Sequence, residues 1–382
     1  MKIQKLRLSN FRNFKSELFE FSPEVTIIIG PNASGKTNVL ESLYLLSTGK
    51  SFHAKIEEEM ISYTADISRI KGQVLSSKGE KEEKTILESV LTRGMLDIGN
   101  GRPERVSRKK LFINGVARRL IDFAGNFRVV LFGPWDLDLV TESPSLRRKF
   151  LDSVLSQIDR EYRRATLSYE KVLRQRNKLL LRIRDENLSR SQLLFWNQLL
   201  IKNGDYISLA RQNFIDFANK TEALNDQKFS LEYDKSPISE GRLEQYAEEE
   251  VAAATTLVGP HRDDFVVKIT NAKKINAKLR AARLPAGRDL ARFGSRGEQR
   301  MAVLWLKLAE LEFIEEKTSE RPTLLLDDIF SELDHQHRGV VMKIIKEQTQ
   351  FRQGSAGQAI ITTADPHFVK NFKKVEKIKL EG

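Results

Sequence analysis

An eight-residue loop near the N-terminus carries the clearest chemical signal in this chain. The segment GPNASGKT, residues 30–37, fits the pattern G-x-x-x-x-G-K-[ST]. Its glycines permit a tight turn that points backbone N–H groups at phosphate oxygens, and the helix that follows adds the positive end of its dipole. Lys36 would reach the β- and γ-phosphates of a nucleotide, and the Thr37 hydroxyl would bind Mg²⁺. This phosphate loop predicts a nucleoside triphosphate site.

Two adjacent carboxylates far along the chain would complete such a site. In RPTLLLDDIFSELD, residues 321–334, a short apolar strand at 323–326 runs directly into Asp327 and Asp328. Two carboxylates at the end of a buried strand are costly unless a metal ion or a water molecule uses them. We expect Asp327 to hold Mg²⁺ through water and Asp328 to activate the attacking water as general base. The alternative is a turn in which an aspartate caps the next helix.

A second polar turn precedes a long apolar helix. This signature turn, GSRGE at residues 294–298, contains Ser295 and Gly297, and apolar residues follow it at helical spacing as far as Phe313. The turn would therefore lie at a helix N-terminus, which attracts anions. One nucleotide does not need two such sites from one subunit, whereas two subunits that share their nucleotides would use both.

The elements that must position these groups form an α/β core. Residues 24–29 contain the β-branched run VTIII and predict a buried strand, and residues 36–47 predict a helix with one apolar face. Since the parts of the site come from opposite ends of the chain, we expect one α/β head interrupted by an insertion. The expected division is an ATPase lobe at 1–145, a helical lobe at 146–255, and the second half of the ATPase lobe at 256–382.

The middle of the chain shows the spacing of helices. From Leu151 to Val172, apolar or small residues alternate at steps of four and three, a heptad stripe. A polar break at 184–191 precedes a second helical run from Leu193 to Phe217. The pattern predicts an antiparallel helical hairpin with helices of about 30 residues, or about 45 Å. A helical subdomain packed on the core, without the role of an arm, is the alternative. Polar residues 232–255 would form the return linker.

The charge of the chain favours a polyanionic partner. The formal net charge is +12, and residues 101–190 alone hold 21 Lys and Arg against 11 Asp and Glu. Such a local excess is typical of proteins that bind nucleic acid, although a solvated basic face would look the same. Candidate contacts to the DNA backbone, with little base readout, are Arg147, Arg148, Lys149, Arg163, Arg164, Arg174 and Arg176.

The composition excludes several other classes. The chain contains no cysteine, which rules out disulfides and Cys-ligated metal sites and suits a reducing compartment. The N-terminus lacks the apolar segment of a signal peptide, and no apolar run approaches the roughly 20 residues of a membrane helix. We therefore expect a cytoplasmic protein.

Several segments together resemble a known family. The phosphate loop, the signature turn and LLLDD resemble the heads of ABC-type ATPases, and the chain as a whole resembles the RecF family of bacterial DNA replication and repair proteins. The segments that carry this resemblance, in order, are LRLSNFRNF (6–14), LFINGV (111–116), FGPWDLDLV (132–140), SPSLRRKFLD (143–152), LRQRNKLL (173–180), VGPHRDDF (258–265) and ITTAD (361–365).

The resemblance implies a head-to-tail dimer that forms on ATP and Mg²⁺. Ser295 and Gly297 of one protomer would contact the γ-phosphate held by the other, Asp334 would line the dimer interface, and Arg12 would reach the phosphates. The residues that would hold the nucleotide within one protomer are Gly30, Pro31, Asn32, Ala33, Ser34, Gly35, Lys36, Thr37 and Asn38.

The resemblance also implies a cellular role. The dimer would clamp duplex DNA at junctions with single-stranded DNA, and it would assist RecA loading together with RecR and RecO. Weak, DNA-stimulated ATP hydrolysis would release the DNA.

The chain departs from the ABC pattern at two places. No clear glutamine lies near residues 132–137, and no histidine follows the last strand, where Thr362, Thr363 and Asp365 stand. These gaps argue against a transporter ATPase. Three other classes compete less well: an SMC-type chromosome ATPase and a nuclease-partner ATPase both need far longer arms, and a metabolic kinase would lack the signature turn.

Overall fold

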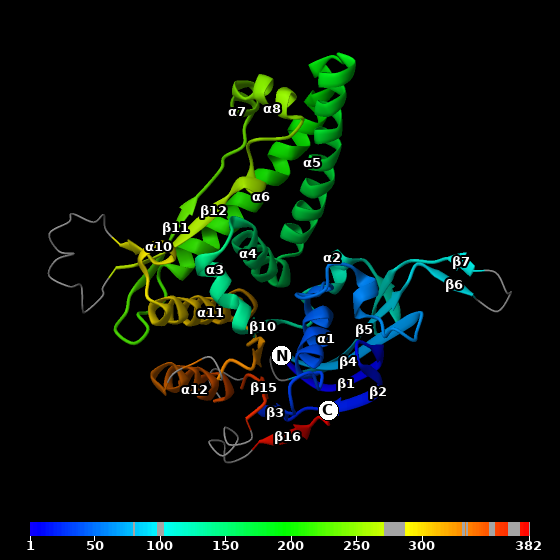
Figure 1. Cartoon of the computed structure of the whole chain (residues 1–382), viewed down its shortest axis with the longest axis vertical. Coiled ribbons are helices and arrows are strands. Elements are labelled where there is room, and N and C mark those ends of the chain that lie inside the picture. Colours follow the sequence, from blue (N-terminus) through cyan, green and yellow to red (C-terminus); the bar gives the residue numbers. More distant parts are fainter. Residues whose placement is uncertain are drawn as a thin grey trace. The chain divides into compact units, whose positions relative to one another are not determined.

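The computed structural model describes residues 1–78, 81–97, 103–270, 287–330, 333, 335–350, 356–365 and 375–381. Internal contacts divide the chain into two units (Figure 1). Unit 1 comprises Met1–Asp136 and Glu310–Gly382, and unit 2 comprises Leu137–Ala309. Within the described residues, no helix combines the length and apolar character that crossing a bilayer would require.

A five-stranded parallel sheet in unit 1 carries the phosphate loop. Its strand order is β10-β14-β15-β3-β16. The strands are β3 (Val25–Ile29), β10 (Val129–Phe132), β14 (Thr323–Asp327), β15 (Ala359–Thr363) and β16 (Glu376–Lys379). Four of them are runs of β-branched and leucine residues buried on both faces, as expected of a parallel sheet. Because β10 pairs with β14, which follows 190 residues later, all of unit 2 is inserted between two neighbouring strands.

An antiparallel sheet of six strands forms the rest of the β-structure in unit 1, beside a separate small hairpin. Its order is β2-β1-β4-β5-β8-β9. The strands are β1 (Lys2–Phe11), β2 (Phe14–Glu20), β4 (Ile67–Lys78), β5 (Lys81–Thr92), β8 (Lys109–Ile113) and β9 (Val116–Arg118), and the hairpin pairs β6 (Met95–Asp97) with β7 (Pro103–Arg105). Buried and exposed residues alternate along β1, so one face of the sheet is buried and the other is open to solvent.

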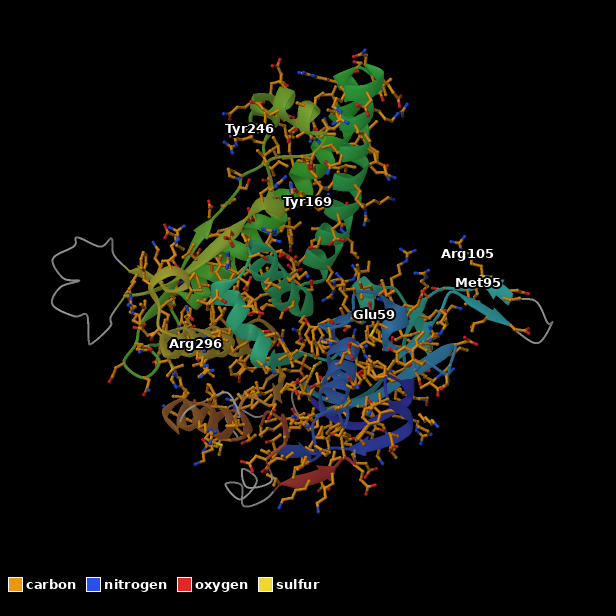
Figure 2. The ribbon with its side chains drawn as sticks, viewed as in Figure 1. Glu59, Met95, Arg105, Tyr169, Tyr246 and Arg296 are labelled. Atoms are coloured by element: carbon orange, nitrogen blue, oxygen red, sulfur yellow. The ribbon has the colours of Figure 1, made fainter. Side chains whose placement is uncertain are left out.

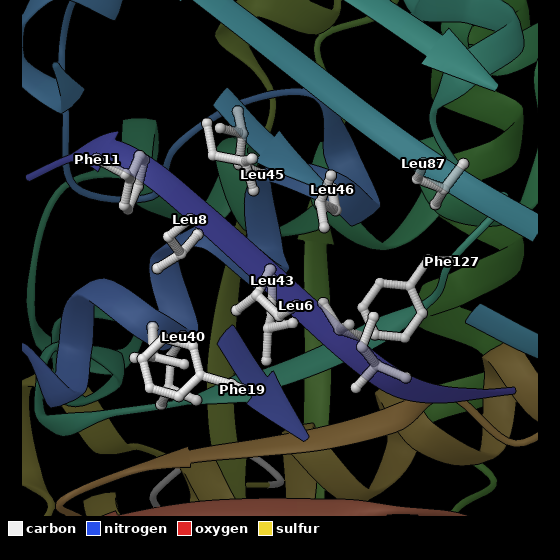
Figure 3. Close-up of a cluster of buried hydrophobic side chains, with 14 of the residues drawn as sticks. Leu6, Leu8, Phe11, Phe19, Leu40, Leu43, Leu45, Leu46, Leu87 and Phe127 are labelled. Carbon is white, nitrogen blue, oxygen red and sulfur yellow. The ribbon is translucent and has the colours of Figure 1, made fainter. Parts of the chain in front are cut away.

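Helix α1 (Lys36–Thr48) lies between the two sheets, and Figure 3 shows its leucines among the side chains of the buried cluster. Its leucines pack against Leu6 and Leu8 of the antiparallel sheet and belong to the same buried cluster as Leu325 and Ile360 of the parallel sheet. The helix ends at Gly49, whose left-handed backbone donates a hydrogen bond to Leu45 O, as helix C-caps commonly do. The predicted strand–loop–helix is therefore confirmed. The other helical segments of unit 1 are η1 (Glu57–Met60), α2 (Leu120–Phe123) and α12 (His335–Thr349).

Helices dominate unit 2, which also contains one small sheet of order β11-β12-β13. The helical segments are α3 (Asp138–Thr141), α4 (Pro144–Ile158), α5 (Arg160–Glu186), η3 (Arg190–Leu193), α6 (Leu194–Ala218), α7 (Glu240–Gln245), α8 (Ala247–Ala253), η4 (Pro260–Arg262) and α10 (Leu290–Phe293), with η2 (Pro134–Leu137) and α11 (Arg296–Thr318) crossing the unit boundaries. The strands are β11 (Phe229–Asp234), β12 (Asp264–Ile269) and β13 (Arg288–Asp289).

The predicted helical hairpin is confirmed, with one correction. Helices α5 and α6 run side by side and the chain reverses at the predicted polar break (Figure 1). The heptad stripe, however, belongs to two helices, because α4 ends at Ile158 and Asp159 caps α5. The Asp159 side chain accepts hydrogen bonds from the N–H groups of Glu161 and Tyr162, which satisfies donors that a continuous helix would have paired internally.

The insertion is larger than predicted. Unit 2 spans 137–309 instead of 146–255, because β12 and β13 pair with β11 and because α4 packs on β12. The prediction of a linker at 232–255 is wrong, since this segment completes β11 and then forms α7 and α8. Its acidic composition concealed a helix that buries Glu250 completely.

Candidate nucleotide site

The phosphate loop has the backbone that its glycines allow. Gly35 adopts φ 97°, and an added Cβ there would lie 2.7 Å from side-chain atoms of Asn13 and Phe14. At Gly30 a Cβ would come within 2.5 Å of Ser34 Oγ and 2.9 Å of Leu380 O. Both positions therefore exclude side chains, and for Gly35 the left-handed backbone adds a second reason.

Lys36 reaches back across the loop. Its Nζ donates to the carbonyl oxygens of Gly30 and Pro31, each at 2.8 Å, and the residue is only 7% exposed. The Ser34 hydroxyl is buried, and within the described residues it has no hydrogen-bond partner. A buried donor without a partner is costly, and a phosphate oxygen would satisfy it. The loop thus fits an anion.

The fold brings Thr37 and Asp327 together. Thr37 Oγ1 donates to Asp327 Oδ2 at 2.8 Å, joining the start of α1 to the end of β14. The other carboxylate oxygen, Oδ1, accepts from Thr362 Oγ1 at 2.6 Å. Thr362 thus orients the carboxylate that the sequence pattern singled out. A hydroxyl and a carboxylate are ligands that suit Mg²⁺, which usually takes its remaining ligands from phosphates and water.

Asp328 has an unusual backbone. Its φ is 44°, in the left-handed region that few residues other than glycine adopt. Its N–H donates to Thr362 O at 3.2 Å and to Thr362 Oγ1 at 3.1 Å. Residues are held in this region mostly where the surrounding structure imposes it, and such positions cluster at active sites. Asp328 is half-buried and thus partly accessible to solvent, whereas Asp327 is buried.

Arg12 is held by carboxylate and carbonyl oxygens of unit 1, and its contact with the phosphates stays a prediction. Its Nε and Nη2 donate to the two oxygens of Glu41 at 2.8 and 2.7 Å, and its Nη1 donates to Glu59 O at 2.6 Å. These bonds to Glu41 raise the pKa of the guanidinium. Glu41 is buried in α1, and a buried carboxylate requires a cation.

Asn13, the next residue, contacts the phosphate loop directly. Its amide nitrogen donates to Ser34 O at 3.3 Å, and its oxygen accepts from Asn38 at 2.8 Å. Sequence reasoning missed both Glu41 and Asn13. Glu41 could have been found, because it is a lone glutamate inside the apolar face of a helix. No feature of the sequence pattern pointed to Asn13.

The signature turn in unit 2 is a capping box at the start of α11. The Ser295 hydroxyl accepts from the Glu298 N–H at 3.3 Å, and Glu298 Oε2 accepts from the Ser295 N–H at 2.8 Å. This reciprocal arrangement fixes the first turn of the helix. Glu298 also binds Arg288 through its other oxygen. Ser295 remains exposed, and Asp334 lies outside the described residues.

Comparisons with known proteins place the chain in a family. A family model described as the RecF/RecN/SMC N terminal domain matches residues 2–382. The DNA replication and repair protein RecF of Herpetosiphon aurantiacus is 36% identical, with 97% of this chain and 96% of that protein covered. This chain belongs to the RecF family. RecF of Natranaerobius thermophilus is 34% identical, with 92% and 90% covered.

Solved structures agree with this assignment. The recombination mediator protein RecF of the RecFOR pathway, in its ATP form, matches with a TM-score of 0.79 at 28% identity, covering 95% of this chain and 92% of that one. An SMC head bound to the C-winged helix domain of ScpA matches with a TM-score of 0.50 at 16% identity, covering 98% and 93%, which shows a shared fold. The predicted ABC-ATPase-like head is confirmed.

Two predicted DNA contacts of this RecF-family chain are buried ion pairs instead. Arg147 is 9% exposed and binds both oxygens of Asp264, at 2.6 and 2.9 Å. Arg176 is 2% exposed and binds Glu250 at 2.6 Å. A guanidinium enclosed in this way cannot meet a phosphate at the surface. These two predictions are wrong because the basic residues of α4 and α5 lie on both the inner and the outer faces of the helices.

The other predicted DNA contacts differ in their exposure to solvent and in the bonds that their side chains already form. Arg148 donates to Asp263 O at 2.8 Å, and burial lowers its pKa. Arg163 donates to Ser156 O, and Arg164 is exposed but pairs with Glu161 at 2.7 Å. Lys149 and Arg174 are exposed, and neither forms an ion pair within the described residues. Lys149 and Arg174 therefore remain the best candidates of this set.

His261 forms two hydrogen bonds within unit 2. Its Nδ1 is 2.8 Å from the hydroxyl of Tyr169, which Figure 2 shows on α5, and its Nε2 is 3.0 Å from Thr256 O. Burial lowers the pKa of His261 to about 4. The imidazole is therefore neutral near pH 7 and serves as a hydrogen-bonding link between α5 and η4.

The pair of Arg176 and Glu250 predicts a large loss of stability when it is broken. Arg176→Ala would leave Glu250, which is 0% exposed, without its cation. We therefore expect the free energy of unfolding to fall by about 3–5 kcal/mol. The nearby Arg174→Ala should change stability by less than about 0.5 kcal/mol, because Arg174 is exposed. Urea unfolding followed by circular dichroism measures both. Equal effects of the two variants would contradict the buried pair.

Proposed function

We propose that this protein is an ATP-dependent DNA-binding clamp in the recombinational repair of gaps and stalled forks. It dimerises on ATP and Mg²⁺ and binds duplex DNA at junctions with single-stranded DNA. It assists RecA loading with RecR and RecO. Weak ATP hydrolysis, stimulated by DNA, then releases the DNA. The names of its relatives and the RecFOR pathway of its structural neighbours support this proposal.

One observation carries the nucleotide part of the proposal. Thr37 and Asp327, 290 residues apart in sequence, are hydrogen-bonded at 2.8 Å beside a loop whose lysine is buried. Such a convergence of hydroxyl, carboxylate and cation at a helix N-terminus fits a magnesium–triphosphate complex and few other ligands. When bound, Mg²⁺ would neutralise charge on the phosphates, with Thr37 and Asp327 as the residues that hold it.

The residues of the chain then have distinct tasks. The loop N–H groups and Lys36 bind the phosphates and fix their orientation. Asp328, the half-buried neighbour of Asp327, accepts a proton from the attacking water. In a dimer, the exposed Ser295 of the partner protomer and the positive end of its α11 face the γ-phosphate. Hydrolysis would then be tied to dimerisation.

The experiment that tests the proposal measures binding of labelled gapped duplex DNA by fluorescence anisotropy, with and without ATP and Mg²⁺, at one salt concentration. Sedimentation in parallel reports the oligomeric state. We expect a dimer and tighter DNA binding only with ATP and Mg²⁺. Equal DNA binding in both conditions would overturn the clamp. A monomer in both conditions would overturn nucleotide-driven dimerisation.

A further inference from the structure

The six-stranded sheet of unit 1 has a charged outward face. Along β1, Leu6 and Leu8 are buried, whereas Lys5 and Arg7 point to the opposite side and are exposed. The same alternation holds on β4, where Ile70 is buried and its neighbours face outward. Since α1 covers only the buried side, this face is open within the described part of unit 1.

Four basic side chains lie at the centre of this face, and two of them form ion pairs with glutamates. They lie on the two neighbouring strands β1 and β4, and the outward positions of β1 and β4 around them carry no carboxylate. Glu20, on β2, binds Lys5 at 2.6 Å, and Glu88, on β5, binds Arg69 at 3.2 Å. The four cations are Lys5, Arg7, Arg69 and Lys71.

Arg7 and Lys71 are the two of these four cations that form no ion pair within the described residues. The strand register places them directly opposite each other across β1 and β4. Both are exposed. Like charges directly opposite in an antiparallel pair destabilise the sheet. Glu88, which pairs with Arg69, also lies directly opposite Lys71 on β5, whereas the residues directly opposite Arg7 are Lys71 and Leu18. An external anion would therefore offset the repulsion between Arg7 and Lys71.

The shape of the face favours an extended anion over a small one. Donors that capture a free phosphate converge on one point, whereas these cations are spread over a sheet whose outward residues repeat about every 6.8 Å along a strand. Duplex DNA presents one negative charge per about 1.7 Å of its axis, so a row of cations meets phosphates in any register. Leu18, opposite Arg7 on β2 and 50% exposed, adds apolar contact area without charge.

We propose that this outward face, centred on Arg7 and Lys71, binds the phosphate backbone of nucleic acid. The inference rests on the DNA-binding part of the proposed function and adds a contact surface on unit 1 that does not require ATP. It carries no base specificity, because a flat sheet face with lysine and arginine contacts the backbone and not the base edges.

The test compares two double variants with the same change in charge. Arg7→Ser/Lys71→Ser removes the unpaired cations, and Lys377→Ser/Lys379→Ser removes two exposed lysines of β16 in the same unit. Binding of a labelled duplex is measured without nucleotide over a series of salt concentrations. We expect the slope of log K against log salt to fall by about 1.8 for the first variant, with affinity roughly tenfold weaker or more at about 0.1 M salt. The β16 variant should keep the wild-type slope.

Two further readouts separate a binding role from a structural one. The melting temperature of Arg7→Ser/Lys71→Ser should stay close to that of the wild type, because the double change removes both the repulsion between Arg7 and Lys71 and the attraction between Lys71 and Glu88. Arg7→Lys should keep the slope, because it keeps the charge. Equal slopes in both double variants would overturn the proposal. Loss of poly-L-glutamate binding with unchanged DNA binding would assign the face to an acidic protein, and would overturn it too.

The outcome is also distinguishable from that of the clamp. If the clamp holds, the Arg7 and Lys71 variant still binds DNA more tightly when ATP is added. If ATP has no effect on the wild type, the clamp fails, while a reduced salt slope in the variant would still support this face.

Discussion

Asp328→Asn is expected to bind ATP normally and to hydrolyse it about 10²–10⁴-fold more slowly than the wild type, the range usual for loss of a general base. Asparagine keeps the size of the side chain and, like aspartate, tolerates the left-handed backbone found at φ 44°. The variant should therefore fold normally and lose only the proton acceptor. Release of inorganic phosphate measures hydrolysis, and binding of a fluorescent ATP analogue measures affinity.

The same variant reports on dimerisation. If hydrolysis opens the dimer, slow hydrolysis should make the ATP-bound dimer accumulate in sedimentation experiments. Asp66→Asn is the matched control, because its side chain is 75% exposed and it should change neither rate nor assembly. Wild-type turnover by Asp328→Asn would reassign the general base to another residue.

Lys36→Ala is expected to weaken ATP binding by about 10²–10⁴-fold, since hydrogen bonds to charged groups contribute about 1.5–3 kcal/mol each and Lys36 would make two. In the protein without nucleotide, Lys36 Nζ is already held at the loop by Gly30 O and Pro31 O, each at 2.8 Å. Its cation is therefore positioned before the phosphates arrive. Titration calorimetry with ATP and Mg²⁺ measures the affinity.

Lys50→Ala provides the control for this change. Lys50 follows α1 directly, is exposed, and lies outside the phosphate loop, so its loss should leave ATP affinity unchanged. The melting temperature of Lys36→Ala shows separately how much the loss of its hydrogen bonds to Gly30 O and Pro31 O destabilises the fold. Normal ATP affinity in Lys36→Ala would refute the phosphate-loop assignment.

The local parts of the nucleotide site were predictable because each depends on a few consecutive residues. The turn around Gly30 and Gly35, the helix that starts at Lys36 and the strand that ends at Asp327 follow from steric limits, β-propensity and helical spacing. Family resemblance added the expected order of the segments.

The tertiary structure decided which charged residues are available for binding. Arg174 and Arg176 are two positions apart on α5, yet one is exposed and the other is buried against Glu250, 74 residues further on. Residues two apart on a helix point in very different directions, and only the packing of α8 determines which direction is inside. The same reason explains why Arg12 binds Glu41 whereas its neighbour Asn13 contacts the phosphate loop.

Sequence by itself determined the α/β head, the phosphate loop, its distant carboxylates and the helical hairpin, because periodicity and turn chemistry are local. Only the tertiary structure decided the extent of unit 2, where β12 and β13 join β11 across long stretches of chain. It also decided the strand register that sets Arg7 against Lys71. Strand pairing and burial depend on partners far away in sequence, and no local pattern specifies them.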